Sequence, residues 1–338
     1  MKIQEIIEEF KLTPEQCKDK EIEKFVLQST IRKKSDDWYQ YWNGNGYIEL
    51  NKEDGTLITT VLNDEEFKPE FPLNIDMEIS KKCENGCSWC YAGCTPDGKH
   101  ADINKYIQDK NSFLYSLHYG TELALNGNEP LHPDLEKLLT FCKERNIVAN
   151  LTVQENTLIK HKDQLEKWLS EKLINGIGVS PCQYSYELID FCQTHPTAVI
   201  HTIAGITTEN QYNKLKNKNI KILILGYKNF GKGVDFISKY PEIIQNNINW
   251  LKMQIKDFVN YFKVVSFDNL AIEQLNPRSF LTDEQWNSFY RGDDGHHTFF
   301  IDLVNETFAK NSMQIKNNHV KLKNDVRDML KEIQEREK

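Results

Sequence analysis

Six short apolar runs recur along the middle of the chain, and a helical stretch follows each of them. The apolar runs cover 73–79, 121–126, 147–153, 176–180, 197–203 and 220–226, and the helical stretches lie near 103–118, 133–145, 158–172, 184–194, 208–218 and 237–261. A chain that alternates strands and helices in this way pairs its strands in parallel and covers them with the helices. We therefore expect an α/β fold of six βα repeats, in which the loops at the carboxyl ends of the strands form the active face.

The segment before the repeats predicts a separate addition. Residues 1 to about 35 have the spacing of charged helices. Residues 46–61 alternate apolar and polar side chains around Asp54-Gly55, which predicts a β-hairpin. The aromatic segment 36–42 is expected to cover the apolar face of this hairpin.

The segment after the repeats predicts an α+β addition. Residues 262–267 have the pattern of one more strand, and 298–309 that of a hairpin around Asn305-Glu306. From Asn317 onward the pattern is that of a charged helix. Its thin apolar stripe consists of Val320, Leu322, Val326, Leu330 and Ile333. We expect three parts, namely 1–72 with the N-terminal helices and hairpin, 73–262 as the core, and 263–338 with the C-terminal strand, hairpin and helix.

Three cysteines stand together directly after the first apolar run. Cys83, Cys87 and Cys90 have the spacing C-x3-C-x2-C on a polar, turn-prone loop. Thiolates are soft ligands that select iron–sulfur clusters, zinc or copper(I). The spacing therefore predicts a metal or cluster site at the end of the first strand.

Two other kinds of site are alternatives to an iron–sulfur cluster held by these three cysteines. A structural zinc site usually has four ligands, often from two separated C-x2-C pairs, but Cys142, Cys182 and Cys192 stand alone. Cys94 extends the run to C-x3-C-x2-C-x3-C before Thr-Pro, which is similar to the ferredoxin run C-x2-C-x2-C-x3-C-P except in its first gap. A non-enzymatic zinc or iron–sulfur binding module is thus an open alternative.

The C-x3-C-x2-C spacing, with the aromatic Trp89 before the last cysteine, resembles the signature of the radical S-adenosylmethionine (radical SAM) superfamily. The resemblance implies a partial (β/α)6 TIM-like barrel and a single [4Fe–4S] cluster held by Cys83, Cys87 and Cys90. One iron would then lack a protein ligand, and in the family that iron chelates the amino and carboxylate groups of SAM. Reductive cleavage of SAM would release a 5′-deoxyadenosyl radical that abstracts hydrogen from a substrate. The overall layout is similar to radical SAM proteins of phages and bacteria.

The resemblance extends to the loop after the second strand. Gly127-Asn128-Glu129-Pro130 is similar to the family's GGEP motif, whose backbone and acidic side chain hold the SAM amino group. Asn128 replaces the second glycine, and we expect the backbone contact to persist because Asn tolerates left-handed conformations. The plain alternative is a strand-to-helix turn in which Pro133-Asp134 begins a helix.

Later strand ends match the family more loosely. The resemblance implies that Ser180 contacts the SAM carboxylate or ribose, that Asn156 is the retained residue of a TNG motif, and that Ile203 contacts adenine. Leu225, Gly226 and Tyr227 begin a glycine-rich loop whose backbone would approach adenine. A glycine-rich loop that binds no ligand is an alternative of equal weight for these residues.

Reactive side chains also follow the cysteines. Tyr91 and Cys94 are candidates for passing a hydrogen atom to a product radical, and His100 for orienting the substrate. Each of these residues is more often a turn or packing residue.

Composition limits the class of protein. The net charge of −8 and the sequence pI near 5.7 argue against general nucleic-acid binding. The apolar runs are too short to span a bilayer, the first residues lack a signal-peptide core, and eight cysteines without an export signal fit a reducing compartment. We therefore expect a cytoplasmic protein without general nucleic-acid or membrane binding. The resemblance to the radical SAM superfamily further implies an enzyme that acts on a small molecule or peptide with electrons from an external donor such as a flavodoxin or ferredoxin. A peptide-modifying or protein-activating role is a further alternative.

Overall fold

The computed structural model describes Thr13 and residues 37–61, 66–290 and 292–336. The helices expected over residues 1 to 35 therefore lie outside the described residues, apart from Thr13. The chain divides into two compact units, residues 1–70 and 71–338.

The first unit contains an antiparallel sheet in the order β1-β2-β3. Its strands are β1 (Trp38–Asn43), β2 (Gly46–Asn51) and β3 (Leu57–Val61). The predicted hairpin is confirmed, since β2 pairs with β3 and the backbone N–H of Thr56 donates to Asp54 Oδ1 at 2.9 Å. The expectation for the aromatic segment was wrong, because it forms β1 and pairs edge to edge with β2 instead of covering a face of the hairpin.

The second unit is built on a ten-stranded sheet in the order β10-β9-β8-β7-β6-β5-β4-β11-β12-β13. Its strands are β4 (Asn74–Glu78), β5 (Glu122–Gly127), β6 (Val148–Gln154), β7 (Gly176–Ser180), β8 (Ala198–Ile203), β9 (Lys221–Leu225), β10 (Val264–Phe267), β11 (Thr298–Asp302), β12 (Thr307–Ala309) and β13 (Val320–Lys321). The pairs from β10 through to β11 are all parallel. The six predicted strands correspond to β4–β9 and are confirmed, as is the seventh strand, β10. In the described chain β10 does not pair with β13, so the sheet is open.

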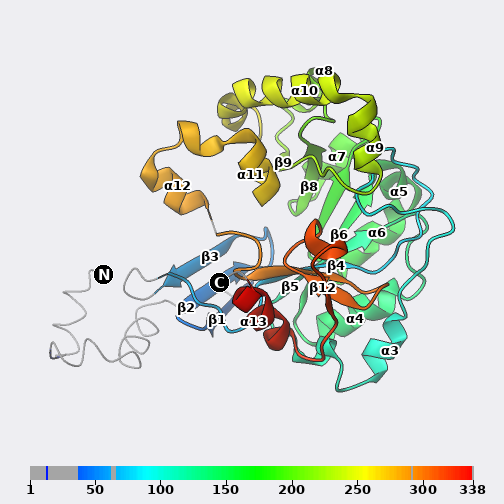
Figure 1. Ribbon diagram of the computed structural model, residues 1–338, viewed down its shortest axis with the longest axis vertical. Helices are drawn as coiled ribbons and strands as arrows, with labels where there is room; N and C mark the ends of the chain where they lie inside the picture. Colours follow the sequence, from blue (N-terminus) through cyan, green and yellow to red (C-terminus); the bar gives the residue numbers. More distant parts are fainter. Residues whose placement is uncertain (1–12, 14–36, 62–65, 291, 337–338) are drawn as a thin grey trace. The chain divides into compact units, whose positions relative to one another are not determined.

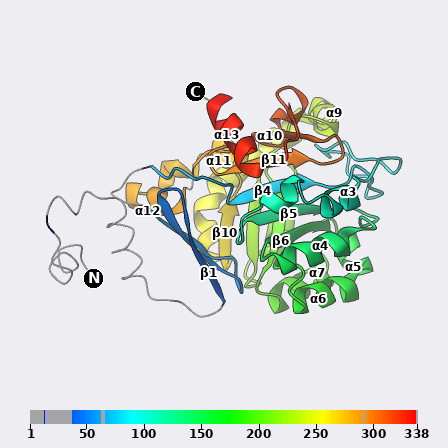
Figure 2. The same ribbon diagram turned by 90° about the horizontal axis from the view of Figure 1, so that it is seen from below.

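Helices lie along the outer side of the parallel strands (Figures 1 and 2). The helices of the described chain are, in order, α3 (Ile103–Gln108), the 3-10 helix η3 (Phe113–Ser116), α4 (Leu135–Glu144), α5 (Glu155–Lys160), α6 (Lys162–Ser170), α7 (Tyr186–Thr194), α8 (Glu209–Leu215), α9 (Lys232–Lys239), α10 (Pro241–Gln254), η4 (Ile255–Asn260), α11 (Asn269–Leu275), η5 (Pro277–Phe280), α12 (Asp283–Phe289), η6 (Gln314–Lys316) and α13 (Val326–Arg336). The predicted helix 237–261 is in fact α9, α10 and η4. α10 starts a new axis at Pro241, because proline fits the first helical turn but not a helix interior. None of the described helices is long and apolar enough to cross a bilayer.

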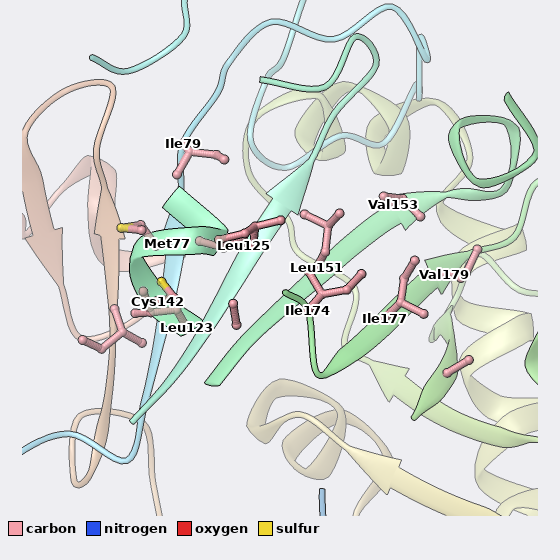
Figure 3. Packing of buried hydrophobic residues seen from close by; sticks show 14 of the residues in the cluster. Met77, Ile79, Leu123, Leu125, Cys142, Leu151, Val153, Ile174, Ile177 and Val179 are labelled. Atoms are coloured by element: carbon pink, nitrogen blue, oxygen red, sulfur yellow. The ribbon is translucent and has the colours of Figure 1, made fainter. Parts of the chain in front are cut away.

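The two faces of the parallel sheet differ in polarity. Figure 3 shows the apolar face, on which Met77, Leu125 and Leu151 pack with side chains of neighbouring strands. Side chains along a strand alternate between faces, so the polar residues between these apolar ones point to the opposite, inner face. That inner face carries Asp76, Glu78, Asn126, Thr152, Gln154 and His201.

The C-terminal segment completes this sheet. The predicted hairpin is confirmed as β11 and β12, and β11 also pairs in parallel with β4. The C-terminal helix begins later than expected: Val320 pairs with Phe308 in β13, and α13 starts at Val326. The assignment of Val320 and Leu322 to this helix was therefore wrong, because strand pairing overrides a helical spacing of apolar residues.

Candidate functional site

The cysteine loop, residues 83–94, leaves the carboxyl end of β4 and is closed at its base by backbone hydrogen bonds. The N–H of Cys83 donates to the Thr95 carbonyl at 2.8 Å, and the N–H of Thr95 donates to the Lys81 carbonyl at 3.1 Å. The N–H of Glu84 donates to the Glu129 carbonyl at 2.6 Å. The loop is therefore fastened both to its own base and to the loop after β5.

Cys83, Cys87 and Cys90 are partly exposed on this loop. Burial and the nearby thiols of Cys90 and Cys83 raise the pKa of Cys87, so the three groups are electrostatic neighbours. Among the described residues, no three His, Cys, Asp or Glu side chains converge in an arrangement that would hold a metal ion. The donor chemistry suits an iron–sulfur cluster, which takes soft thiolate ligands.

Cys94 differs from the other three because it is buried, with 6% of its surface exposed. Asn128 Nδ2 lies 3.5 Å from its Sγ, and the thiol donates to Glu78 Oε1 at 3.8 Å. The hydrogen bond with Cys90 and burial raise the pKa of Cys94. Cys94 is thus held by its neighbours in the base of the loop.

Asn128 acts through its side chain. Its Nδ2 donates to the Ser80 carbonyl at 2.9 Å, and Asn126 Nδ2 donates to the same carbonyl at 2.8 Å. Asn128 does not have a positive φ, so its backbone does not use the tolerance of asparagine for left-handed conformations. The asparagine instead supplies a donor that a glycine at this position lacks.

A buried charge cluster lies below the cysteine loop. Lys81 forms ion pairs with Glu78 and, at 3.2 Å, with Asp302 on β11. Burial raises the pKa of Glu78 to about 7, although Lys81 opposes this shift. The base of the loop is therefore joined to β4 and to β11 at once.

Glu129, the residue expected to hold the SAM ammonium, is 8% exposed. Its carboxylate forms an ion pair with Lys160 and accepts from His161 Nε2 at 2.9 Å. Burial raises the pKa of Glu129, but the hydrogen bonds from Lys160 and His161 outweigh this effect and lower the pKa overall. The cis peptide bond between Glu129 and Pro130 lies next to this pair.

The loop after β9 packs directly on the cysteine loop. The backbone N–H of Lys232 donates to the Cys90 carbonyl at 3.0 Å, and its Nζ donates to the Cys94 carbonyl at 2.8 Å. The Trp89 and Phe236 rings meet edge to face at 5.6 Å. In this loop three residues were expected near adenine: Leu225 ends β9, the backbone N–H of Gly226 donates to Asp268 Oδ1, and the Tyr227 hydroxyl donates to the Gly233 carbonyl.

Gly231 lies where these two loops approach each other closely. It has φ of +59°, and a Cβ there would lie 2.2 Å from the Tyr91 carbonyl oxygen. We expect Gly231→Ala to lower the melting temperature and to reduce the iron bound after reconstitution. Gly93→Ala is the control, because Gly93 has a similar φ of +67° but an added Cβ there meets no atom within 4 Å. Equal losses in both variants would mean that the φ strain, on the order of 1–2 kcal/mol, explains the effect without the Tyr91 contact.

Other predicted cofactor residues lie at neighbouring strand ends. Ser180 and Ile203 are the last residues of β7 and β8, and both are partly exposed. Asn156 is exposed in the first turn of α5, and its Oδ1 accepts from Gln183 Nε2 at 3.3 Å. Gly127 is buried as the last residue of β5.

Glu155, beside Asn156, anchors the loop after β7. Its fully buried carboxylate accepts four backbone N–H groups at 2.7–3.0 Å. The donors are Cys182, Gln183, Tyr184 and Ser185. Burial raises the pKa of Glu155, but these hydrogen bonds outweigh that effect and lower the pKa to about 2.

Two candidate catalytic residues face different neighbours. His100 Nδ1 lies 2.9 Å from Ser80 Oγ, and burial lowers the pKa of His100. The Tyr91 ring lies beneath the Lys228 ammonium at 4.1 Å. Burial raises the pKa of Tyr91, as do the charges of Glu78 and Asp76.

Two polar side chains on the inner face were not among the residues predicted from the sequence. Gln154 Nε2 donates to Cys87 Sγ at 3.2 Å, while its Oε1 is buried without a partner among the described residues. The His201 ring packs where a Cβ at Gly178 would lie 2.2 Å away, and burial lowers the pKa of His201 to about 4. The polar–apolar alternation of residues 150–154 is the sequence signal for Gln154, whereas β8 has no such alternation to indicate His201.

No model of a known protein family matches the chain, and no curated protein matches its sequence. Among solved structures, the crystal structure of Streptococcus suis SuiB bound to S-adenosylmethionine is similar, with a TM-score of 0.57 at 14% sequence identity. The similarity covers 89% of this chain and 87% of that chain. At this identity it shows that the two chains share a mixed α/β fold.

Proposed function

We propose that the protein is a radical SAM enzyme in which Cys83, Cys87 and Cys90 hold a [4Fe–4S] cluster. The observation that carries the proposal is the C-x3-C-x2-C loop at the carboxyl end of β4, in a fold shared with a protein whose structure contains SAM. Once bound, the cluster would supply the electron that cleaves SAM to a 5′-deoxyadenosyl radical. The cytoplasmic location and the flavodoxin or ferredoxin donor stay predictions.

The chain's own residues would bind and orient SAM at the ends of β5–β8. Glu129 supplies a carboxylate for the SAM ammonium, and Ser180 a hydroxyl for its carboxylate or ribose. Gln154 Oε1 is an acceptor without a partner in the described chain, beside Cys87. Buried acceptors are normally paired, so a donor from a bound ligand would complete this site.

Replacing Glu129 tests the SAM site. We expect Glu129→Ala to keep its iron but to bind SAM more weakly by about 1–3 kcal/mol, because a charge-assisted contact is lost. Titration of the reconstituted protein with SAM measures this change. Lys160→Met is the control, because it removes a partner of Glu129 and leaves the carboxylate in place. Unchanged SAM affinity in Glu129→Ala would remove Glu129 from the site.

The reaction itself is tested by anaerobic reconstitution with iron and sulfide, followed by reduction in the presence of SAM. The expected product is 5′-deoxyadenosine, detected by chromatography and mass spectrometry. Cys87→Ala, treated identically, should form none. A wild-type protein that assembles a four-iron cluster yet forms no 5′-deoxyadenosine with any reductant would contradict the proposal.

A further inference from the structure

A cavity of about 70 Å³ lies on the inner side of β4. Roughly 10–15 Å³ is enough for one water, so this space accommodates a group of several heavy atoms. Its lining comes from β4, from the loops after β9, β10 and β12, and from the start of β11. The charged lining residues are Asp76, Lys228, Asp268, Asp294 and Lys310. Three carboxylates face two ammonium groups there, so the lining has an excess of negative charge.

Most of these charges already have partners inside the protein. Asp268 Oδ1 accepts the backbone N–H groups of Gly226 and Ala271, each at 2.8 Å. Asp294 accepts from Asn269 Nδ2 at 2.7 Å and from Asn311 Nδ2 at 2.9 Å. These two carboxylates therefore shape the lining and do not require a ligand.

Lys228 is also engaged elsewhere. Its Nζ donates to Ser312 Oγ at 2.9 Å and lies over the Tyr91 ring. In the described chain no ion pair joins Lys228 to Asp76, although its charge acts on that carboxyl from across the cavity. The contact with Tyr91, which follows Cys90 directly, places this wall of the cavity beside the cysteine loop.

Asp76, in contrast, has no such partner among the described residues. It lies in the middle of β4 between Ile75 and Met77, whose side chains are 0% and 1% exposed on the opposite face. Its side chain is exposed to the cavity and has neither a hydrogen bond nor an ion pair with any described residue. An exposed carboxylate without a protein partner is available to a ligand, so a cationic donor in the cavity would pair with Asp76.

We propose that this cavity binds a cationic nitrogen group of the substrate, an ammonium or a guanidinium, with Asp76 as its counterion. The inference rests on the proposed function, because it identifies the ligand as the substrate that reacts beside the cysteine loop. It narrows the substrate class to amines and guanidines, which include peptides with Lys or Arg side chains. Lys228 at the edge of the cavity would disfavour a second cation at that end.

The ionisation of Asp76 agrees with this assignment. Burial raises the pKa of Asp76 to about 6; the charge of Lys228 opposes the shift, and those of Glu122, Asp294 and Asp268 add to it. The folded-state pKa lies above the usual value of 3.8, so the ionised form is disfavoured in the fold without a cation. Cation binding should therefore strengthen as the pH rises through about 6.

The test measures binding of two small probes, methylguanidinium and ethylammonium, by calorimetry on the full-length protein without SAM. We expect both to bind at millimolar concentration at pH 7.5 and at least tenfold more weakly in Asp76→Asn. Asp163→Asn, at an exposed position on α6, is the matched control and should bind like the wild type. N-methylurea, a neutral analogue, and acetate should not bind.

Thermal denaturation shows whether Asp76→Asn is folded, so that a loss of probe binding is not mistaken for a loss of folding. Asp76→Asn should melt no lower than the wild type at pH 7.5, because it removes a disfavoured charge. Equal probe affinity in Asp76→Asn and the wild type, or binding of acetate in place of the cations, would overturn the inference. A wild type that binds the cations but does not cleave SAM would instead contradict the proposed function alone.

Discussion

Alanine at Cys83, Cys87 or Cys90 is expected to abolish assembly of the four-iron cluster, whereas Cys94→Ala should still assemble it. A cluster that must leave one iron open for SAM can use only three thiolates. Cys94 is buried among Glu78 and Asn128, while the other three thiols are partly exposed. Iron and sulfide analysis, with the absorption and electron paramagnetic resonance spectra of each reconstituted variant, measures the difference.

The spectrum of reduced Cys94→Ala should also change when SAM is added, because the open iron is preserved. If Cys94→Ala loses its iron as completely as Cys87→Ala, the site has four thiolate ligands and an electron carrier or zinc module becomes the better explanation. If Cys94→Ala cleaves SAM but no longer converts a true substrate, Cys94 becomes the leading hydrogen-atom donor.

Glu155→Gln is expected to destabilise the fold by about 3 kcal/mol at pH 7. The pKa of Glu155 is lowered from 4.5 to about 2 in the folded chain, and each pKa unit corresponds to about 1.4 kcal/mol. A glutamine removes the charge and turns one acceptor into a donor facing backbone N–H groups. Glu144→Gln is the control, because Glu144 is exposed at the end of α4 and should change stability by less than about 0.5 kcal/mol.

The pH dependence separates this charge effect from a packing defect. A group whose pKa is lowered by folding stabilises the fold fully above its unfolded pKa, and loses that effect as the pH falls through the folded value. The difference between the wild type and Glu155→Gln in urea denaturation should therefore shrink by roughly half or more between pH 7 and pH 3. A difference that stays constant over this range would contradict an electrostatic role for Glu155.

The sequence predicted β4–β9 well because buried parallel strands are short, apolar and separated by helices. It failed where two patterns compete: the helical spacing that includes Val320 and Leu322 was outweighed by pairing of Val320 with Phe308. Apolar spacing records which side chains are buried, but not which partner buries them. The same limit explains the aromatic segment that became β1.

The loops of the candidate site could be located from the sequence, but the contacts within it could not. The three cysteines and Glu129 could be located from spacing. The two partners of Glu129 could not, because Lys160 ends the helix after the next strand and His161 follows that helix. Residues 73–79 alternate apolar and polar side chains, which indicates a strand with one polar face, and Asp76 is one of the polar positions.

The pairing of β4 with β11 affects the order in which the protein folds during synthesis. β4 carries the cysteine loop near the start of the second unit, and its neighbour on one side comes from residues 298–302, close to the C-terminus. The ribosome makes the chain from its N-terminal end, so β4 has a free edge until β11 has been synthesised. Lys81 likewise lacks Asp302 until then. We therefore expect the thiol loop to reach its final support only after β11 has paired with β4.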